Sequence, residues 1–257
     1  MKTVIFTDLD DSLLHSERRL REIGEDRSET AVASLTVDGR PICFQTERQA
    51  KLSQLLSHAD LVIPVTGRSS ESLNRVIRPQ FSSYRIVSHG ALILTPSGVP
   101  WSPWVSEIKG EVAEGRHHLT MLFEELEEWR EHNETLRHQE ERTLRLKFVK
   151  DYEHPCYLSV KGPERLISPL AEELKERWRY GIIHHNRRDL AILPTYASKE
   201  RAVSYLQNHL RTDLESPLMS IGVGDSLSDL PFLSQCDFSL TPRSSMIQHA
   251  LLGIIER

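Results

Sequence analysis

The chain has 257 residues, of which 39% are apolar and 27% charged, and its formal net charge is −5. This composition excludes a disordered chain, and the acidic balance argues against a protein that wraps nucleic acid with a basic surface. No apolar run reaches the ~20 residues that span a bilayer, and no signal-peptide core follows Lys2. Cys43, Cys156 and Cys236 are too widely spaced for a disulfide framework or a metal knuckle. We therefore expect a cytoplasmic globular protein that binds neither nucleic acid nor membrane, as a monomer or homodimer.

In chain order, the first recurring elements are short apolar runs that end in small or acidic residues. These runs lie at 4–6, 61–65, 86–87 and 219–223. Runs of this kind are typical of strands buried on both faces of a parallel sheet. Helical patterns lie between them, at 46–56, 69–77 and 198–210. The alternation predicts an α/β fold with a doubly wound, mostly parallel sheet. In addition, Asp38-Gly39 lies between two strand-like runs, 31–37 and 41–45, and predicts a two-residue hairpin turn.

The middle of the chain has a different pattern. A turn-rich linker at 96–103 precedes an amphipathic helix, and Leu144, Leu146 and Phe148 then alternate with charged residues as in a strand with one wet face. Further strands and a second helix follow, at 157–160, 166–178, 181–184 and 189–193. The order α-β-β-α-β-β is typical of an antiparallel sheet with helices on one face. We therefore expect a core of residues 1–95 and 191–257, interrupted by an inserted α+β domain at 96–190.

Acidic residues follow two of the predicted parallel strands, at the point where each strand ends. Asp8 and Asp10 follow the first run, and Asp225 and Asp229 follow the run at 219–223. In open α/β sheets, ligands bind at the carboxyl ends of the strands. Carboxylates gathered there repel one another and need a counter-charge, and oxygen ligands of this kind suit Mg²⁺.

Lys199 lies at the start of a predicted helix, directly after Ser198. A cation at this position opposes the helix dipole, at a cost of ~0.3–1 kcal/mol. A nearby anion, such as a carboxylate or a phosphate, explains the placement. Thr66-Gly67-Arg68 completes the group, because it follows the strand at 61–65.

In this order, these motifs resemble those of the haloacid dehalogenase superfamily of phosphohydrolases. Residues 8–12, Asp-Leu-Asp-Asp-Ser, match its first motif, Thr66 the second, Lys199 the third, and residues 224–229, Gly-Asp-Ser-Leu-Ser-Asp, the fourth. The resemblance spans the whole chain. The inserted domain resembles the C2B-type cap of the Cof-like, sucrose-phosphate phosphatase-like and phosphomannomutase-like members.

The resemblance implies a role for each motif residue. Asp8 is the nucleophile and forms an aspartyl-phosphate. Asp10 acts as a general acid and base, Thr66 hydrogen-bonds the transferring phosphoryl group, and Lys199 neutralises the charge around Asp8.

The resemblance also implies a Mg²⁺ site. Its ligands are Asp8, the backbone carbonyl of Asp10, and Asp225, while Asp229 orients a metal-bound water or Lys199. From the residues alone, a second interpretation stays open, in which Asp229 caps the following helix.

The chain departs from the family pattern at two positions near the expected substrate. Ser228 replaces an Asn that often precedes the last Asp, and His89-Gly90 replaces Asn-Gly. The resemblance therefore implies no particular substrate. We take as substrate-binding candidates Gly67, Arg68, His89, Ser226, Ser228, Arg187 and Arg188. For Arg68 the alternative is a solvated surface residue, and for Arg187 and Arg188 it is a solvated hairpin tip.

Taken together, the resemblance implies a Mg²⁺-dependent phosphatase that hydrolyses a small phosphomonoester through an aspartyl-phosphate. We expect a sugar phosphate or sugar-acid phosphate as the substrate. Two alternatives stay open: a phosphosugar mutase, which returns the phosphate to the sugar, and a non-catalytic binding or regulatory protein on the same scaffold.

Overall fold

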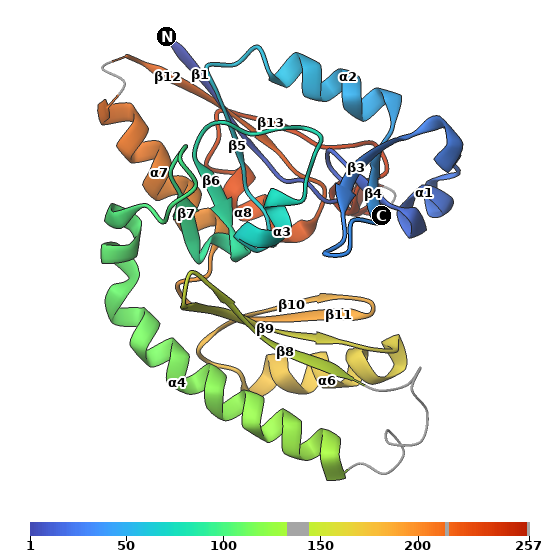
Figure 1. Cartoon of the computed structure of the whole chain (residues 1–257), viewed down its shortest axis with the longest axis vertical. Helices are drawn as coiled ribbons and strands as arrows, with labels where there is room; N and C mark the ends of the chain where they lie inside the picture. Colours follow the sequence, from blue (N-terminus) through green and yellow to red (C-terminus); the bar gives the residue numbers. More distant parts are fainter. Residues whose placement is uncertain (133–143, 214–215, 256–257) are drawn as a thin grey trace. The chain divides into compact units, whose positions relative to one another are not determined.

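The computed structural model describes residues 1–132, 144–213 and 216–255 (Figure 1). The chain divides into two compact units, which are described separately. Unit 1 comprises Met1–Trp101 and Lys199–Arg257, and unit 2 comprises Ser102–Ser198. The expected end of the insert, residue 190, falls inside a strand of unit 2.

Unit 1 contains the elements from both ends of the chain. They are β1 (Lys2–Thr7), β2 (His15–Ser16), α1 (Glu17–Ile23), β3 (Ala31–Leu35), β4 (Pro41–Gln45), α2 (Glu47–Leu56), β5 (Leu61–Pro64), α3 (Ser70–Asn74), β6 (Arg85–Val87), β7 (Leu92–Leu94), α7 (Lys199–Asp213), β12 (Leu218–Val223), α8 (Leu230–Leu233), β13 (Phe238–Leu240) and α9 (Met246–Ile255). The helix predicted at 69–77 is shorter in the structure, where α3 ends at Asn74.

The main sheet of unit 1 is parallel, with the strand order β13-β12-β1-β5. β1 lies between β12 and β5, and its residues Val4, Ile5 and Phe6 are buried because helices and loops cover both faces of the sheet. This arrangement confirms the predicted α/β fold. It also places the carboxyl ends of β12, β1 and β5 next to one another.

A second, antiparallel sheet follows β1, in the order β2-β4-β3. The strands β3 and β4 form the predicted hairpin, but its loop is one residue longer than the predicted two-residue turn at Asp38-Gly39. The Thr36 amide donates to the Arg40 carbonyl at 2.8 Å, which leaves residues 37–39 as the loop, and the Gly39 amide donates to the Thr36 carbonyl at 3.1 Å. Gly39 has a φ of 79°, so the glycine supplies the left-handed position of a three-residue loop. The Thr36 and Arg40 side chains both donate to the Asp38 carboxylate.

Unit 2 contains α4 (Ser102–His132), β8 (Arg145–Asp151), β9 (His154–Lys161), α6 (Glu164–Arg177), β10 (Gly181–Asn186) and β11 (Asp189–Pro194). Its sheet is antiparallel, in the order β10-β11-β9-β8, and α4 and α6 lie on one face of it (Figure 1). The core between helices and sheet includes Leu122, Leu158, Val160, Leu174 and Ile192. The predicted α-β-β-α-β-β order is confirmed.

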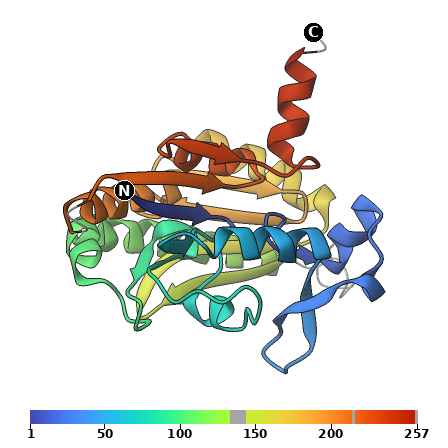
Figure 2. The same cartoon turned by 90° about the horizontal axis from the view of Figure 1, so that it is seen from above.

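The last helix, α9, leads away from the sheet of unit 1 (Figure 2). Leu251 and Leu252 on this helix are about half exposed, at 49% and 51%. α9 is rich in apolar residues, but with 10 residues it is too short to cross a bilayer. Within the described parts of the chain, no helix is both long and apolar enough to do so.

Candidate active site

Three neighbouring strands bring the first, second and fourth motifs to one edge of the main sheet. Asp8 directly follows β1, and its amide donates to the Val223 carbonyl of β12 at 2.8 Å. On the other side of β1, the Val65 amide donates to the Thr7 carbonyl at 2.7 Å. Asp225 and Thr66 therefore lie at the carboxyl ends of the two strands that flank Asp8, as the strand-end pattern predicts.

Lys199, the first residue of α7, connects two of these carboxylates. Its Nζ atom lies 2.7 Å from an oxygen of Asp8 and 2.8 Å from an oxygen of Asp229. All three side chains are at least nine-tenths buried. Burial alone lowers the pKa of an ammonium, but the charges of Asp229 and Asp8 outweigh it and raise the pKa of Lys199. The ammonium therefore stays charged in the site.

Asp229 is held by the loop that follows β12. One of its carboxylate oxygens accepts from the Ser226 hydroxyl at 2.8 Å and from the Ser226 amide at 3.1 Å. A side chain at Gly224 would place its Cβ 2.8 Å from the Asp229 Cβ, so this approach requires glycine. Asp229 makes no side-chain hydrogen bond to the start of α8, so the helix-cap alternative is wrong.

The carboxylates of Asp8, Asp225 and Asp229 form a group that suits a metal ion. One oxygen of each lies within 4.8 Å of the others, and all three residues are buried. They face the single positive charge of Lys199, so two negative charges remain to be balanced. A divalent cation with oxygen ligands meets both requirements. The donor set therefore fits Mg²⁺.

The pKa values at this cluster reflect the same excess of negative charge. Burial raises the pKa of Asp8 well above its usual value, with further contributions from Asp229 and Asp225 against the opposing effect of Lys199. Burial and the charge of Asp229 raise the pKa of Asp225 to about 7. Burial opposes ionisation of Asp229 too, but Lys199 and the hydrogen bonds from Ser226 hold its pKa below the usual value. A bound cation reverses the first two effects.

The loop after β5 packs against the loop after β6. The Thr66 hydroxyl accepts from the Arg68 amide at 3.1 Å, and its own proton remains available for donation. The His89 amide donates to the Thr66 carbonyl at 3.0 Å, and His89 adopts a left-handed conformation with φ of 57°. A Cβ at Gly67 would lie 2.5 Å from the His89 ring. Gly67 and His89 are therefore in direct contact, at the edge that carries Thr66.

Asp10 and Arg68 form a two-pronged ion pair. Arg68 Nε lies 2.8 Å from one oxygen of Asp10, and Nη2 lies 2.6 Å from the other. The Arg68 side chain is only 12% exposed, whereas that of Asp10 is 51% exposed. The alternative that placed Arg68 on the solvated surface is therefore wrong.

The remaining substrate-binding candidates fall into two groups. Ser226 and Ser228 lie in the loop after β12, with their hydroxyl oxygens 2.7 Å apart. Arg187 and Arg188 are exposed at the turn between β10 and β11 in unit 2, where Arg188 Nε donates to the Gly162 carbonyl at 3.3 Å. The first group lies beside Asp229; the second lies on the other compact unit.

Ser34 on β3 and Cys43 on β4 also contact this site, and the sequence pattern did not indicate either residue. Arg68 Nη1 lies 3.0 Å from the Ser34 hydroxyl, and Nη2 lies 3.1 Å from the Cys43 sulfur. No local motif marks these residues, because their contact depends on where the hairpin packs.

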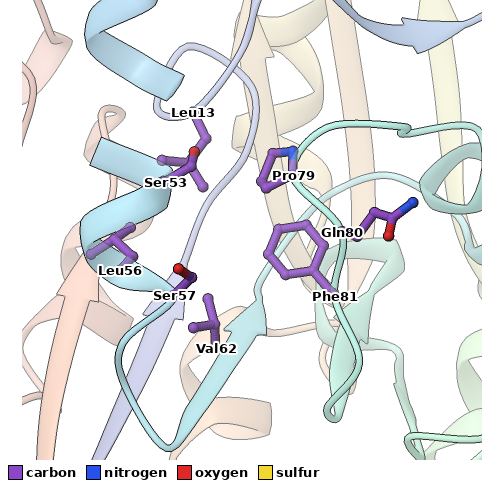
Figure 3. A pocket seen from close by; sticks show the side chains of 8 residues that line it. All are labelled: Leu13, Ser53, Leu56, Ser57, Val62, Pro79, Gln80 and Phe81. Atoms are coloured by element: carbon purple, nitrogen blue, oxygen red, sulfur yellow. The ribbon is translucent and has the colours of Figure 1, made fainter. Parts of the chain in front are cut away.

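A crevice elsewhere in unit 1 contains none of the predicted site residues (Figure 3). It lies between α2 and the chain after α3, and Leu13, Leu56, Val62 and Phe81 give it a mainly apolar lining.

Comparisons with known proteins identify a phosphohydrolase family, in agreement with the motif residues that the site brings together. A family model described as sucrose-6F-phosphate phosphohydrolase matches residues 1–239. A search of curated proteins finds no match.

Three solved structures align with almost the whole chain, and two of them, with TM-scores above 0.5, share its fold. A trehalose-6-phosphate phosphatase related protein is 15% identical, with a TM-score of 0.52 over 98% of this chain and 96% of that chain. A Thermoplasma acidophilum protein is 11% identical, with a TM-score of 0.53 over 98% and 89%. A haloacid dehalogenase-like hydrolase from Bacteroides thetaiotaomicron is 14% identical, with a TM-score of 0.44 over 99% and 100%.

Proposed function

The chain belongs to the sucrose-6F-phosphate phosphohydrolase family of haloacid dehalogenase phosphatases, and from this premise we propose that it is a Mg²⁺-dependent sugar-phosphate phosphatase with Asp8 as its nucleophile. The observation that carries the proposal is the position of Lys199, which bridges Asp8 and Asp229 in a buried site at the carboxyl ends of parallel strands. The family membership makes the chain a phosphoric monoester hydrolase; the metal, the substrate class and the residue roles are what we propose.

The proposed reaction has two steps. An oxygen of Asp8 attacks phosphorus, the bond from phosphorus to the leaving oxygen breaks, and Asp10 gives that oxygen a proton. Water then attacks phosphorus in the aspartyl-phosphate and gives a proton to Asp10, and the bond from phosphorus to the Asp8 oxygen breaks. This step releases inorganic phosphate and restores the Asp8 carboxylate. Lys199 and the Thr66 hydroxyl stabilise the charge on the phosphoryl oxygens in both steps.

The metal would be held by the carboxylates of Asp8 and Asp225 and by the backbone carbonyl of Asp10. When bound, Mg²⁺ supplies charge neutralisation that lets an anionic carboxylate approach an anionic phosphate. Asp229 already accepts hydrogen bonds from Lys199 and Ser226, so we assign it the task of orienting Lys199.

The substrate class follows from the family description, which names a sugar phosphate. We propose a phosphorylated sugar or sugar-acid derivative, with His89, Gly67 and Ser228 near the leaving group. Unit 2 corresponds to a C2B-type cap, an assignment supported by its α-β-β-α-β-β order and its antiparallel sheet. Arg187 and Arg188, at the turn of one of its hairpins, are proposed as anion-binding residues of that cap.

We also propose a cytoplasmic location. Cys43, Cys156 and Cys236 are all free thiols, and a reducing compartment keeps thiols in this state.

The test is phosphate release from a panel of phosphomonoesters that includes sucrose 6F-phosphate and trehalose 6-phosphate. Wild type and Asp8→Asn are compared with and without Mg²⁺, and the products are examined for isomerised phosphosugars. Release that requires the metal and is lost in the variant is the expected result. Isomerised phosphosugar with little free phosphate would instead identify a mutase. Full activity of Asp8→Asn would overturn the assignment of the nucleophile.

A further inference from the structure

The guanidinium of Arg68 contacts three residues from three different segments of unit 1. Nε and Nη2 donate to the two oxygens of Asp10, at 2.8 and 2.6 Å. Nη2 also donates to the Cys43 sulfur at 3.1 Å, and Nη1 to the Ser34 hydroxyl at 3.0 Å. A guanidinium has five N–H donors in a rigid plane. Four of them point at these acceptors, so little of the group is left to bind a phosphoryl oxygen.

The hairpin that supplies Ser34 and Cys43 is itself fixed to the rest of unit 1. The Leu35 amide donates to the Arg75 carbonyl at 3.0 Å, and the Ile77 amide donates to the Ala33 carbonyl at 2.8 Å. Ser34 is 1% exposed and Cys43 is 6% exposed. The hairpin therefore offers Arg68 a fixed support through Nη1 and Nη2, while Nε and Nη2 contact Asp10.

Asp10 receives this two-pronged contact while half of its side chain stays exposed. A bidentate pair fixes the plane of a carboxylate as well as its position. The lone pairs that do not face Arg68 remain accessible to a leaving group or a water molecule. An aspartate on a flexible χ1 and χ2 otherwise samples several orientations.

We propose that Arg68 is a positioning residue for Asp10: braced by Ser34 and Cys43, it fixes the orientation in which Asp10 transfers protons, and it does not bind the phosphoryl group. This inference rests on the proposed function, because it assigns to Asp10 the proton transfers of the two-step reaction. Asp10 gives one proton to the leaving oxygen in the first step and takes another from the attacking water in the second, so its protonation state is restored.

A substrate with a good leaving group separates these two roles. p-Nitrophenolate leaves without a proton from Asp10, so the first step with p-nitrophenyl phosphate does not need a correctly oriented Asp10. Hydrolysis of the aspartyl-phosphate still needs it. Loss of Arg68 should therefore leave a rapid burst of p-nitrophenol followed by slow turnover. If Arg68 bound the phosphoryl group, its loss would slow the burst itself.

The experiment measures burst and steady-state kinetics of p-nitrophenyl phosphate for wild type, Arg68→Ala, Asp10→Asn and the double variant, with phosphate release from the best sugar phosphate in parallel. Arg48→Ala, which removes an arginine whose side chain is 87% exposed, is the matched control. General acid–base catalysis contributes about 10²–10⁴-fold. We expect Arg68→Ala to lower steady-state turnover by about 10–100-fold and to change the burst rate by less than about twofold.

The double variant should be no slower than Asp10→Asn alone, because the two residues act as a unit. Arg68→Lys, which keeps the charge but loses the two-pronged geometry, should show the same burst with a smaller defect in turnover; it also serves if Arg68→Ala fails to fold. A slowed burst, an additive double variant, or unchanged turnover of the sugar phosphate overturns the inference. An inactive wild type overturns the proposed function and, with it, this inference.

Discussion

At the scale of single residues, Lys199 is the cation that balances two buried carboxylates of the candidate site. It is buried with Asp8 and Asp229 as partners, and removal of one partner from a buried ion pair leaves an uncompensated charge. Here the loss of one cation leaves two carboxylates without their counter-charge. We therefore expect Lys199 to contribute to the stability of the fold as well as to the proposed reaction.

We expect Lys199→Ala to lower the free energy of unfolding by about 3–5 kcal/mol and to abolish phosphatase activity. Urea denaturation at neutral pH measures the first effect. Lys51→Ala, at an exposed lysine of α2, is the control and should change stability by less than about 0.5 kcal/mol. The double variant Lys199→Ala/Asp229→Asn should recover part of the loss, since it removes one of the unpaired charges. A loss below about 1 kcal/mol for Lys199→Ala would contradict this explanation.

The sequence predicts some of these contacts and not others, for a physical reason. Asp8, Thr66 and Asp225 each follow a strand, and the edge common to parallel strands brings them together whatever the details of packing. Lys199 was recognised because a cation at a helix start needs an anion nearby. Arg68 follows a strand too, but its partners Ser34 and Cys43 lie on a hairpin whose position depends on tertiary contacts. Its contacts with these two residues were therefore not predicted.

At the scale of elements, the edge strand β13 pairs with β12 along the backbone and is also linked to it by one side chain. Asp237 directly precedes β13 and accepts hydrogen bonds from the Ser220 amide at 2.7 Å and the Ser220 hydroxyl at 2.8 Å. These bonds hold the pKa of Asp237 below its usual value. β13 has only three residues, all exposed, so this contact fixes an element with little packing of its own.

The depressed pKa of Asp237 makes its contribution to stability dependent on pH. A carboxyl whose pKa is lower in the folded state stabilises the fold above its unfolded pKa, about 3.9, and the effect disappears as the pH falls through the folded value. We expect Asp237→Asn to be less stable than wild type at pH 7, and the difference to shrink below about pH 4. Thermal unfolding across this range measures it. A difference that stays constant with pH would contradict the role of the charge.

Helix starts were easier to predict than turns. Thr46 and Gln49 form the expected capping box at α2: the Gln49 amide donates to the Thr46 hydroxyl at 3.2 Å, and the Gln49 side chain accepts from the Thr46 amide at 3.1 Å. Both partners of the capping box lie within one turn of helix, so a stretch of four residues is enough to predict where α2 begins. The loop around Asp38 depends on Thr36 and Arg40 as well, and the Asp-Gly signal alone gave the wrong loop length.

At the scale of the whole molecule, unit 2 is one continuous stretch of chain with its own core. Its helices α4 and α6 and its sheet bury Leu119, Leu126, Val160, Ile167 and Ile192, among other apolar residues. A segment with a complete core of this kind has the properties of an independently folding domain.

We therefore expect a fragment of residues 102–198 to fold on its own and to unfold cooperatively on heating. Circular dichroism against temperature measures the transition. Leu158→Ala, which removes most of a side chain that is 1% exposed, should destabilise the fragment by about 2–5 kcal/mol. A fragment with no cooperative transition would show that its core depends on unit 1.

The interruption of unit 1 by unit 2 has a consequence for the order in which the chain is made. Thr7 ends β1, and the neighbouring strand β12 begins at Leu218, about 210 residues later. At about 5–20 residues per second on the ribosome, β1 waits roughly 10–40 seconds for that neighbour. Unit 2 has been made before then, and Asp8 meets Lys199 and Asp229 only after it. The proposed catalytic residues of a nascent chain therefore come together after unit 2 has been synthesised, and one edge of the central strand β1 needs protection until that moment.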